Sequence, residues 1–288
     1  MQPTAKSLIL DLLSTLRGGA MPVRALVAAA GLFGIAENGV RVELARLTAR
    51  GLVTRDQRGQ YRLAEAAAAV QGRVASWGRT EERIVDWDGG WIAAHTGGLP
   101  RVRRGAQRSR TRALDFLGFR ELAPALWVRP RNLRGGVAEV RRQLQALGLE
   151  PAARVFALDD LDGPTEAHAR TLWDVPAMVA AYRTTRRALE ESERHVRRLP
   201  VEQAMVETFL LGGNAIRQLA LDPVLPEPIV PAAERGALAR ALVQYDRVGR
   251  QCWSAFMRGY RAPYKRSPVN LRVVSAVGEL PAAGSATS

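Results

Sequence analysis

The segment from Glu37 to Leu63, ENGVRVELARLTARGLVTRDQRGQYRL, limits the possible folds of this chain more than any other stretch. Its apolar residues Val40, Leu44 and Leu47 recur at helical spacing, which predicts a helix with one buried face. Gly51 ends this helix, because glycine readily adopts the left-handed conformation of a helix C-terminus. The next residues, LVTR and QYRL, alternate around a turn and predict a β-hairpin.

Two further helical patterns precede this segment. Residues 6–17 carry apolar side chains at helical spacing and end at the glycine pair 18–19. The stretch VRALVAAA predicts a second short helix, which follows Pro22 and ends at Gly31. Three short helices followed by a hairpin are the order of a winged helix-turn-helix domain, which we predict over residues 1–63.

The charge of the chain points to polyanionic partners. Its net charge is +14 and its pI is about 11.2, so DNA, RNA or a phosphorylated ligand would be attracted to it. Only two lysines occur, Lys6 and Lys265. A GC-rich genome would contribute to this arginine excess. The placement of the arginines therefore has to show whether the charge serves nucleic-acid binding.

The chain carries no sign of export or membrane insertion. No run of about 18 apolar residues occurs, as a membrane-spanning helix would need. Asp11 interrupts the apolar N-terminal segment, so we do not expect a signal peptide. The single cysteine, Cys252, excludes an internal disulfide. We therefore expect a cytoplasmic protein.

The middle of the chain alternates strands and helices. WIAAH, LWVRP and ARVFAL predict strands, and a further strand is expected near residues 119–122. Helical segments are expected at 99–117 and 137–149. This alternation predicts a ferredoxin-like α/β domain over residues 88–170, after a linker helix within 64–87.

The remaining residues predict a C-terminal all-helical domain over 171–260, so the chain as a whole belongs to the α+β class. Long helical patterns flank the connector DPVLPEPIVP, residues 222–231, whose four prolines require an extended conformation. Residues 261–288 lack a strong period, and we expect a disordered tail there.

Several blocks, in this order, resemble the PaaX family of phenylacetic acid degradation transcriptional repressors. They are IAENGVRVELARL, WDGGW, LGFRELAPALWVRP, LWDVPAMVAAY and DPVLPEPIVP. The resemblance covers residues 6–258 and rests on the order of the blocks, since no single block is specific.

The resemblance implies a repressor that binds operator DNA as a homodimer and controls aromatic-compound catabolism. It also implies a middle domain similar to the Cas2 ferredoxin-like fold. An aryl-CoA thioester such as phenylacetyl-CoA would release the repressor from DNA.

Two positions depart from the family pattern. Ala36 stands where the family has a serine or threonine helix cap, and GGNAIRQ replaces a histidine-aromatic-basic cluster, with only Arg217 similar in character. The alternative is therefore a DNA-binding regulator with a different small-molecule effector, or with none.

The predicted third helix carries the candidate DNA contacts. The first residues of such a helix enter the major groove, where arginine pairs with guanine and asparagine with adenine. We expect Arg41 and Asn38 to read bases, and the helix arginines farther along and those of the hairpin to bind mainly phosphate. The full set of candidate DNA-binding residues is Asn38, Arg41, Val42, Arg46, Arg50, Arg55, Arg58 and Arg62. The alternative is a solvated helix face on which Glu37 or Glu43 pairs with an arginine.

An effector site cannot be assigned from periodicity. The resemblance to a family that binds a CoA ester leads us to name five arginines as guesses for phosphate contacts: Arg129, Arg131, Arg183, Arg186 and Arg187. The basic run RVRRGAQRSRTR, residues 101–112, could bind DNA or CoA phosphates, or it could be a solvated helix face.

The sequence gives little support for catalysis. It contains no phosphate loop, no catalytic triad and no metal-ligand spacing, so we expect no cofactor and no metal. DDLD at 159–162 could bind a metal. However, the first strand of the ferredoxin-like domain, WIAAH, lacks the aspartate that nuclease relatives need, so a metal-dependent nuclease is the weaker alternative.

Overall fold

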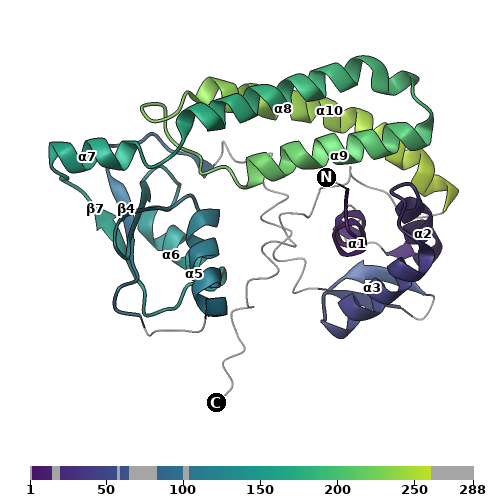
Figure 1. Ribbon diagram of the computed structural model, residues 1–288, viewed down its shortest axis with the longest axis horizontal. Helices are drawn as coiled ribbons and strands as arrows, with labels where there is room; N and C mark the ends of the chain where they lie inside the picture. The colour runs from purple at the N-terminus through teal and green to yellow at the C-terminus, as the bar shows by residue number, and fades with distance from the viewer. Residues whose placement is uncertain (1, 15–19, 57–58, 65–82, 100–103, 261–288) are drawn as a thin grey trace. The chain divides into compact units, whose positions relative to one another are not determined.

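The computed structural model describes residues 2–14, 20–56, 59–64, 83–99 and 104–260. The described chain mixes helices and sheets, and its C-terminal part is helical (Figure 1). It divides into two compact units, which are treated separately below. The first unit holds the described residues up to 64 together with 183–220 and 236–260, and the second unit holds 83–182 and 221–235.

The N-terminal part of the first unit contains three helices and a small sheet. The helices are α1 (Ala5–Ser14), α2 (Val23–Gly31) and α3 (Glu37–Ala49). The strands are β1 (Met21–Pro22), β2 (Val53–Arg55) and β3 (Gln60–Leu63), which pair antiparallel in the order β1-β3-β2. The predicted helices and hairpin are confirmed within the described residues, whereas the short strand β1 was not predicted.

This part has a continuous apolar core. Leu8 and Leu12 of α1 and Leu26 of α2 are at most 1% exposed, as are Val40 and Leu44 of α3. Leu47, the third predicted seam residue of α3, is also fully buried. The predicted buried face of α3 is therefore confirmed.

Long helices complete the first unit. They are α8 (Val175–His195), of which residues from 183 onward belong here, the 3-10 turn η3 (Val196–Arg198), α9 (Val201–Ala220) and α10 (Ala232–Gly259), which belongs here from residue 236. Aromatic rings connect them with the N-terminal helices. The ring centroid of Phe33, which follows α2, lies 5.0 Å from that of Phe209 in α9, and Phe209 lies 5.9 Å from Trp253 in α10.

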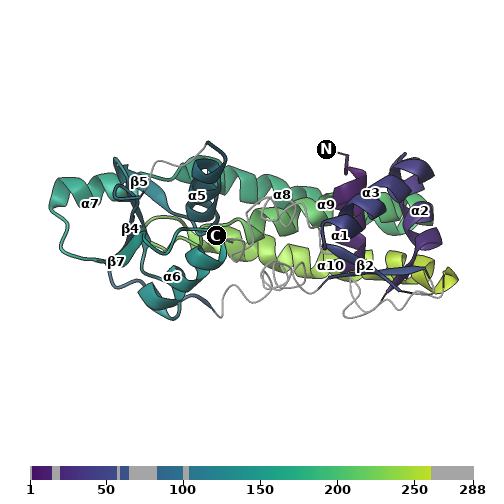
Figure 2. The same ribbon diagram turned by 90° about the horizontal axis from the view of Figure 1, so that it is seen from below.

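The second unit is built on a four-stranded antiparallel sheet in the order β5-β6-β4-β7. Helices α5 and α6 lie on one face of this sheet, as both views show (Figures 1 and 2). The strands are β4 (Trp91–His95), β5 (Arg120–Ala123), β6 (Leu126–Pro130) and β7 (Arg154–Leu158), and the helices are α5 (Arg104–Phe116), α6 (Gly136–Ala146) and α7 (Gly163–Arg170). The predicted strands and the two longer helices are confirmed, and α7 was not predicted.

The connector between α9 and α10 fills the core of the second unit. Its residues Leu225, Ile229 and Val230 pack with Trp91 and Trp173 in one apolar cluster. The segment from 222 to 230 contains no helix or strand and ends in a turn, as its prolines predicted. The connector, which links two helices in the sequence, is therefore part of the core of the sheet domain.

Some predictions fall outside the described residues. These are most of the linker helix within 64–87 and the whole tail 261–288. No described helix is long and apolar enough to cross a membrane.

Candidate nucleic-acid interface

The outer face of α3 is the candidate interface. The buried seam of this helix leaves the side chains of Asn38, Arg41, Val42, Arg46 and Arg50 exposed. Ala36 precedes the helix and forms no side-chain cap bond, while Glu37 places a negative charge at the positive end of the helix dipole. The first turn of α3 is thus polar and open to a partner.

Arg41 and Arg46 of the α3 face are paired with local glutamates. Arg41 Nε donates to Glu37 Oε1 over 2.8 Å, and Arg46 lies 3.6 Å from Glu43. The Arg41 and Arg46 side chains remain 57% and 70% exposed. Exposed pairs of this kind contribute only ~0–1 kcal/mol, so each arginine can exchange its glutamate for a DNA group at little cost.

Val42 is an unusual member of this face. It is 42% exposed, although valine is normally buried. An exposed apolar group among arginines and an asparagine suits the major groove, where thymine presents a methyl group.

The hairpin presents further arginines. Arg55 lies over the ring of Tyr61, 5.8 Å from its centroid, and Arg62 lies 3.9 Å from Asp56. Asp56 Oδ1 also accepts from the backbone N–H of Gln60 over 2.8 Å, which joins the residue after β2 to the first residue of β3. Arg58 lies outside the described residues.

Arg129, one of the guessed effector residues, is buried and hydrogen-bonded within the protein. It is 2% exposed and donates to the carbonyl of Leu117, to Asn132 Oδ1 over 3.2 Å and to the carbonyl of Pro223 over 3.3 Å. Burial, with a smaller effect of Arg83, lowers the pKa of Arg129 to about 9, so the group stays charged at neutral pH. Arg129 binds β6 to the connector, and we leave it out of any effector site.

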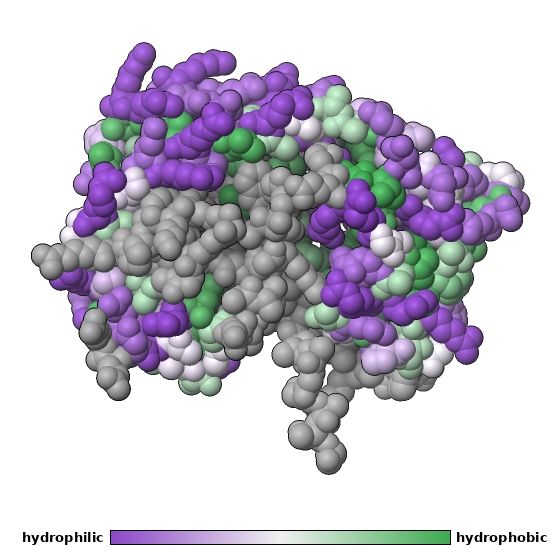
Figure 3. All heavy atoms as spheres, turned by 180° about the vertical axis from the view of Figure 1, so that it is seen from behind, coloured by the Kyte–Doolittle hydropathy of each residue, from purple (hydrophilic) through white to green (hydrophobic). Residues whose placement is uncertain are grey.

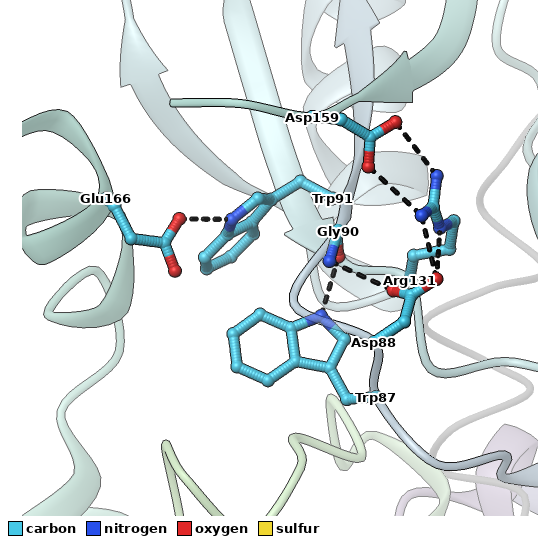
Figure 4. A network of polar contacts seen from close by, with 7 residues as sticks. All are labelled: Trp87, Asp88, Gly90, Trp91, Arg131, Asp159 and Glu166. Carbon is cyan, nitrogen blue, oxygen red and sulfur yellow. Dashed lines mark hydrogen bonds and ion pairs between the residues drawn. The ribbon is translucent and has the colours of Figure 1, made fainter. Parts of the chain in front are cut away.

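Arg131 is part of a compact polar network at the edge of the sheet (Figure 4). It lies 2.7 Å from Asp88 and 3.0 Å from Asp159, and its hydrogen bond lowers the pKa of the Asp88 carboxyl. Trp91 Nε1 donates to Glu166 over 2.7 Å in the same region. The block WDGGW is thus joined by an ion pair to Arg131, which directly follows the block LGFRELAPALWVRP, and spacing alone did not reveal this contact.

The other three guessed effector residues lie on α8 in the first unit. Arg186 lies 3.1 Å from Glu190, whereas Arg183 and Arg187 are exposed. Within each unit the structure therefore brings together only part of the guessed set, and that prediction remains untested.

The acidic stretch 159–162 has structural partners. Asp159 pairs with Arg131, and Asp162 accepts from the Thr165 N–H over 2.9 Å as the N-cap of α7. Among the described residues, no group of three His, Cys, Asp or Glu side chains converges as a metal site would require.

Comparison with known proteins adds to this geometry. Residues 4–67 match the family model described as PaaX-like protein. The transcriptional repressor PaaX of Escherichia coli strain K12 is 28% identical over an alignment of 280 residues that covers 93% of this chain and 83% of that protein. The chain is therefore similar to PaaX proteins, by family model at its N-terminus and by sequence over most of its length. The relative is named as a transcriptional repressor, which is a non-enzymatic regulator.

A solved structure is also similar. The uncharacterized protein Rv0674 from Mycobacterium tuberculosis aligns with a TM-score of 0.57 and 24% identity, over 87% of this chain and 99% of that one. At this identity the similarity concerns the fold alone. It indicates that another protein shares the α+β architecture of this chain.

Proposed function

We propose that this protein is a sequence-specific DNA-binding transcriptional regulator that acts as a repressor. The observation that carries the proposal is the outer face of α3, where Asn38, Arg41 and Val42 are exposed opposite a buried seam. Arginine, asparagine and a small apolar side chain suit guanine, adenine and the thymine methyl group respectively. Similarity to a protein named as a repressor supports the regulatory role.

We assign α1 to α3 with the β1-β3-β2 sheet to a winged helix-turn-helix domain, residues 1–63. The β2–β3 hairpin would then be the wing, and α3 the recognition helix. We assign residues 88–170 to a ferredoxin-like domain, because its strand order β5-β6-β4-β7 and two covering helices are those of the split βαβ fold. Residues 171–260 form the helical C-terminal part.

The regulator would act in the cytoplasm as a homodimer on a palindromic operator, because a symmetric protein matches two half-sites. Its effector would be an aryl-CoA thioester such as phenylacetyl-CoA. A connection from the helical part to the DNA-reading helix exists within the first unit. Phe33 precedes α3 in the chain and contacts Phe209 of α9, so a ligand-driven movement of α9 would reach α3.

The test is fluorescence anisotropy with the duplex upstream of the protein's own gene and a random duplex as control. Both are measured over a salt series, with and without phenylacetyl-CoA. We expect tight binding to the upstream duplex, and we expect phenylacetyl-CoA to reverse it.

The possible results separate the parts of the proposal. Tight, specific binding that the thioester does not reverse would support DNA recognition and remove phenylacetyl-CoA as the effector. Equally weak, salt-sensitive binding to both duplexes would contradict sequence-specific recognition, and the assignment of α3 would fail with it.

A further inference from the structure

The outer face of α10 carries a line of hydrogen-bond donors. At 100° per residue, Arg240, Arg247 and Arg258 lie within about 20° of one line along the helix, and with a rise of 1.5 Å per residue they span about 27 Å. All three are exposed. Gln244, Gln251 and Ser254 lie between them on the same face. We call these six residues the α10 stripe.

The α10 stripe lacks the acidic neighbours found elsewhere. Asp246 is the sole acidic residue of residues 236–259. Its side chain is only 12% exposed and pairs with Arg250, away from the line of the stripe. On α3 and α8, by contrast, some arginines pair with glutamates of the same helix, as in Arg41–Glu37 and the partly exposed Arg186–Glu190.

Among the described residues, no ion pair joins the three arginines of the stripe to a carboxylate. Neither Arg240 nor Arg258 forms an ion pair with another described residue, and Arg247 donates to Gln244 over 3.1 Å. Figure 3 shows hydrophilic side chains gathered over the long helices at the top of the view. Arginines that no carboxylate of the described residues neutralises can bind an external anion.

The length and chemistry of the stripe favour the backbone of DNA as this anion. Arginine, glutamine and serine all donate to phosphate oxygens, and such contacts carry no base preference. Each DNA strand has one phosphate per about 3.4 Å of axis, so a straight stripe of about 27 Å can face several phosphates. A single small phosphorylated ligand would use only one or two of these donors.

We propose that the α10 stripe binds the phosphate backbone of DNA that flanks the bases read by α3. The inference rests on the proposed function, since it assumes that α3 reads a DNA site, and the stripe belongs to the same compact unit as α3. It extends the DNA contact to residues that no base-reading motif includes.

The experiment compares two variants that lose the same charge. The test variant carries Arg240→Gln, Arg247→Gln and Arg258→Gln, and glutamine keeps the helix propensity close to that of arginine. The control variant carries Arg120→Gln, Arg142→Gln and Arg154→Gln, three exposed or partly exposed arginines of the second unit. Circular dichroism melts establish that both variants fold.

Binding is measured by anisotropy over a salt series, on the minimal operator and on the operator extended by about one helical turn (10 base pairs) at each end. We expect the test variant to lose affinity on the extended duplex, with the slope of log K against log salt reduced by up to about 3 for each bound protomer. Its preference for operator over random DNA should stay unchanged, and the control variant should match the wild type.

Three results would overturn the proposal. The first is a test variant with the wild-type salt slope on the extended duplex. The second is an equal loss in the control variant, which would assign the effect to net charge. The third is a test variant whose sedimentation without DNA shows a changed oligomeric state, which would make the stripe a contact between copies. If wild-type protein binds no duplex specifically, the proposed function itself fails, which is a distinguishable result.

Discussion

At the scale of single residues, Arg41 is the position at which base recognition can be tested. Its guanidinium is held by Glu37 in the free protein, but the pair is exposed and weak. We predict that Arg41→Ala reduces the discrimination between operator and random DNA by about 1–3 kcal/mol, because a bidentate contact to guanine would be lost. Competition anisotropy with both duplexes measures this ratio.

Arg46 provides the matched control for Arg41. It lies on the same helix with a similar glutamate partner, but farther from the N-terminus of α3. Arg46→Ala should weaken binding to all sequences alike, since phosphate contacts position the protein without specifying bases. Equal losses on operator and random DNA for Arg41→Ala would remove its proposed base-reading role.

Tyr182 gives a pH-dependent prediction. Its hydroxyl donates to the Asp222 carboxylate, and burial, followed by the charge of Asp222, raises the pKa of Tyr182. Because the phenol ionises near pH 10 when unfolded, this bond contributes fully below pH 10 and is lost progressively as the pH rises above it. We predict that Tyr182→Phe lowers the unfolding free energy by about 1–2 kcal/mol at pH 7.

The difference between wild type and Tyr182→Phe should then shrink above pH 10. Urea unfolding followed by circular dichroism, at pH 7 and pH 10.5, measures it. A difference that stays constant across this range would show that the hydroxyl contributes no pH-linked stability. The pKa of Tyr245 is raised in both proteins. Its contribution to the pH dependence of the unfolding free energy is therefore the same in both and cancels in the difference.

At the scale of elements, the sequence predicted the helices and strands that have a repeating apolar pattern of their own. The seam of Val40, Leu44 and Leu47 is a local property of α3, and the structure buries all three. Strand β1 has two residues and no alternation of its own, and only its pairing with β3 makes it a strand. Helix α7 could have been found, because Asp162 and the following Gly-Pro are a capping signal. Asp162 is also the last residue of the acidic stretch DDLD, which favours a metal-binding interpretation over a helix cap.

The candidate site shows the same division. The exposed positions on α3 follow from its helical period, so they could be predicted. The role of Arg129 could not, since its acceptors come from Leu117 and Pro223, which are distant in sequence. Nothing in the local sequence distinguishes a buried arginine with carbonyl partners from an exposed one.

The turn before β5 gives a prediction about element packing. Gly118 has a φ of +77°, and a Cβ there would lie 2.7 Å from Pro223 Cβ and 2.8 Å from Pro223 Cα. Gly118→Ala should therefore lower the unfolding free energy by about 3 kcal/mol, from left-handed backbone strain together with overpacking. Urea unfolding followed by tryptophan fluorescence measures it.

Gly34 is the matched control for Gly118. Its φ is +71°, but a Cβ there would meet nothing within 4 Å. Gly34→Ala should lower the unfolding free energy by only about 1–2 kcal/mol, the strain alone. If the two variants lose the same stability, the close approach of the connector to Gly118 carries no energetic weight.

At the scale of the whole molecule, the excess positive charge predicts strong salt dependence. Arg46, Arg50, Arg55 and Arg62 are exposed candidates for phosphate contacts. At about 0.9 for each contact, they give on the minimal operator, without the flanking contacts of the α10 stripe, a slope of log K against log salt of about −3.6 for one protomer and about −7 for a dimer on two half-sites. Anisotropy from 50 to 300 mM salt measures the slope, and sedimentation measures the number of chains on each duplex. A slope shallower than about −2, or one chain on each duplex, would contradict the proposed dimer.

The path of the chain through the two units has a consequence for synthesis. The apolar cluster around Trp91 and Trp173 includes Leu225, Ile229 and Val230 of the connector. A ribosome releases the sheet residues long before it releases these three. The nascent second unit therefore exposes apolar surface until most of the first unit has also been made. A truncation before residue 225 would leave that surface open, so neither unit corresponds to a single continuous fragment that could be expressed or exchanged by itself.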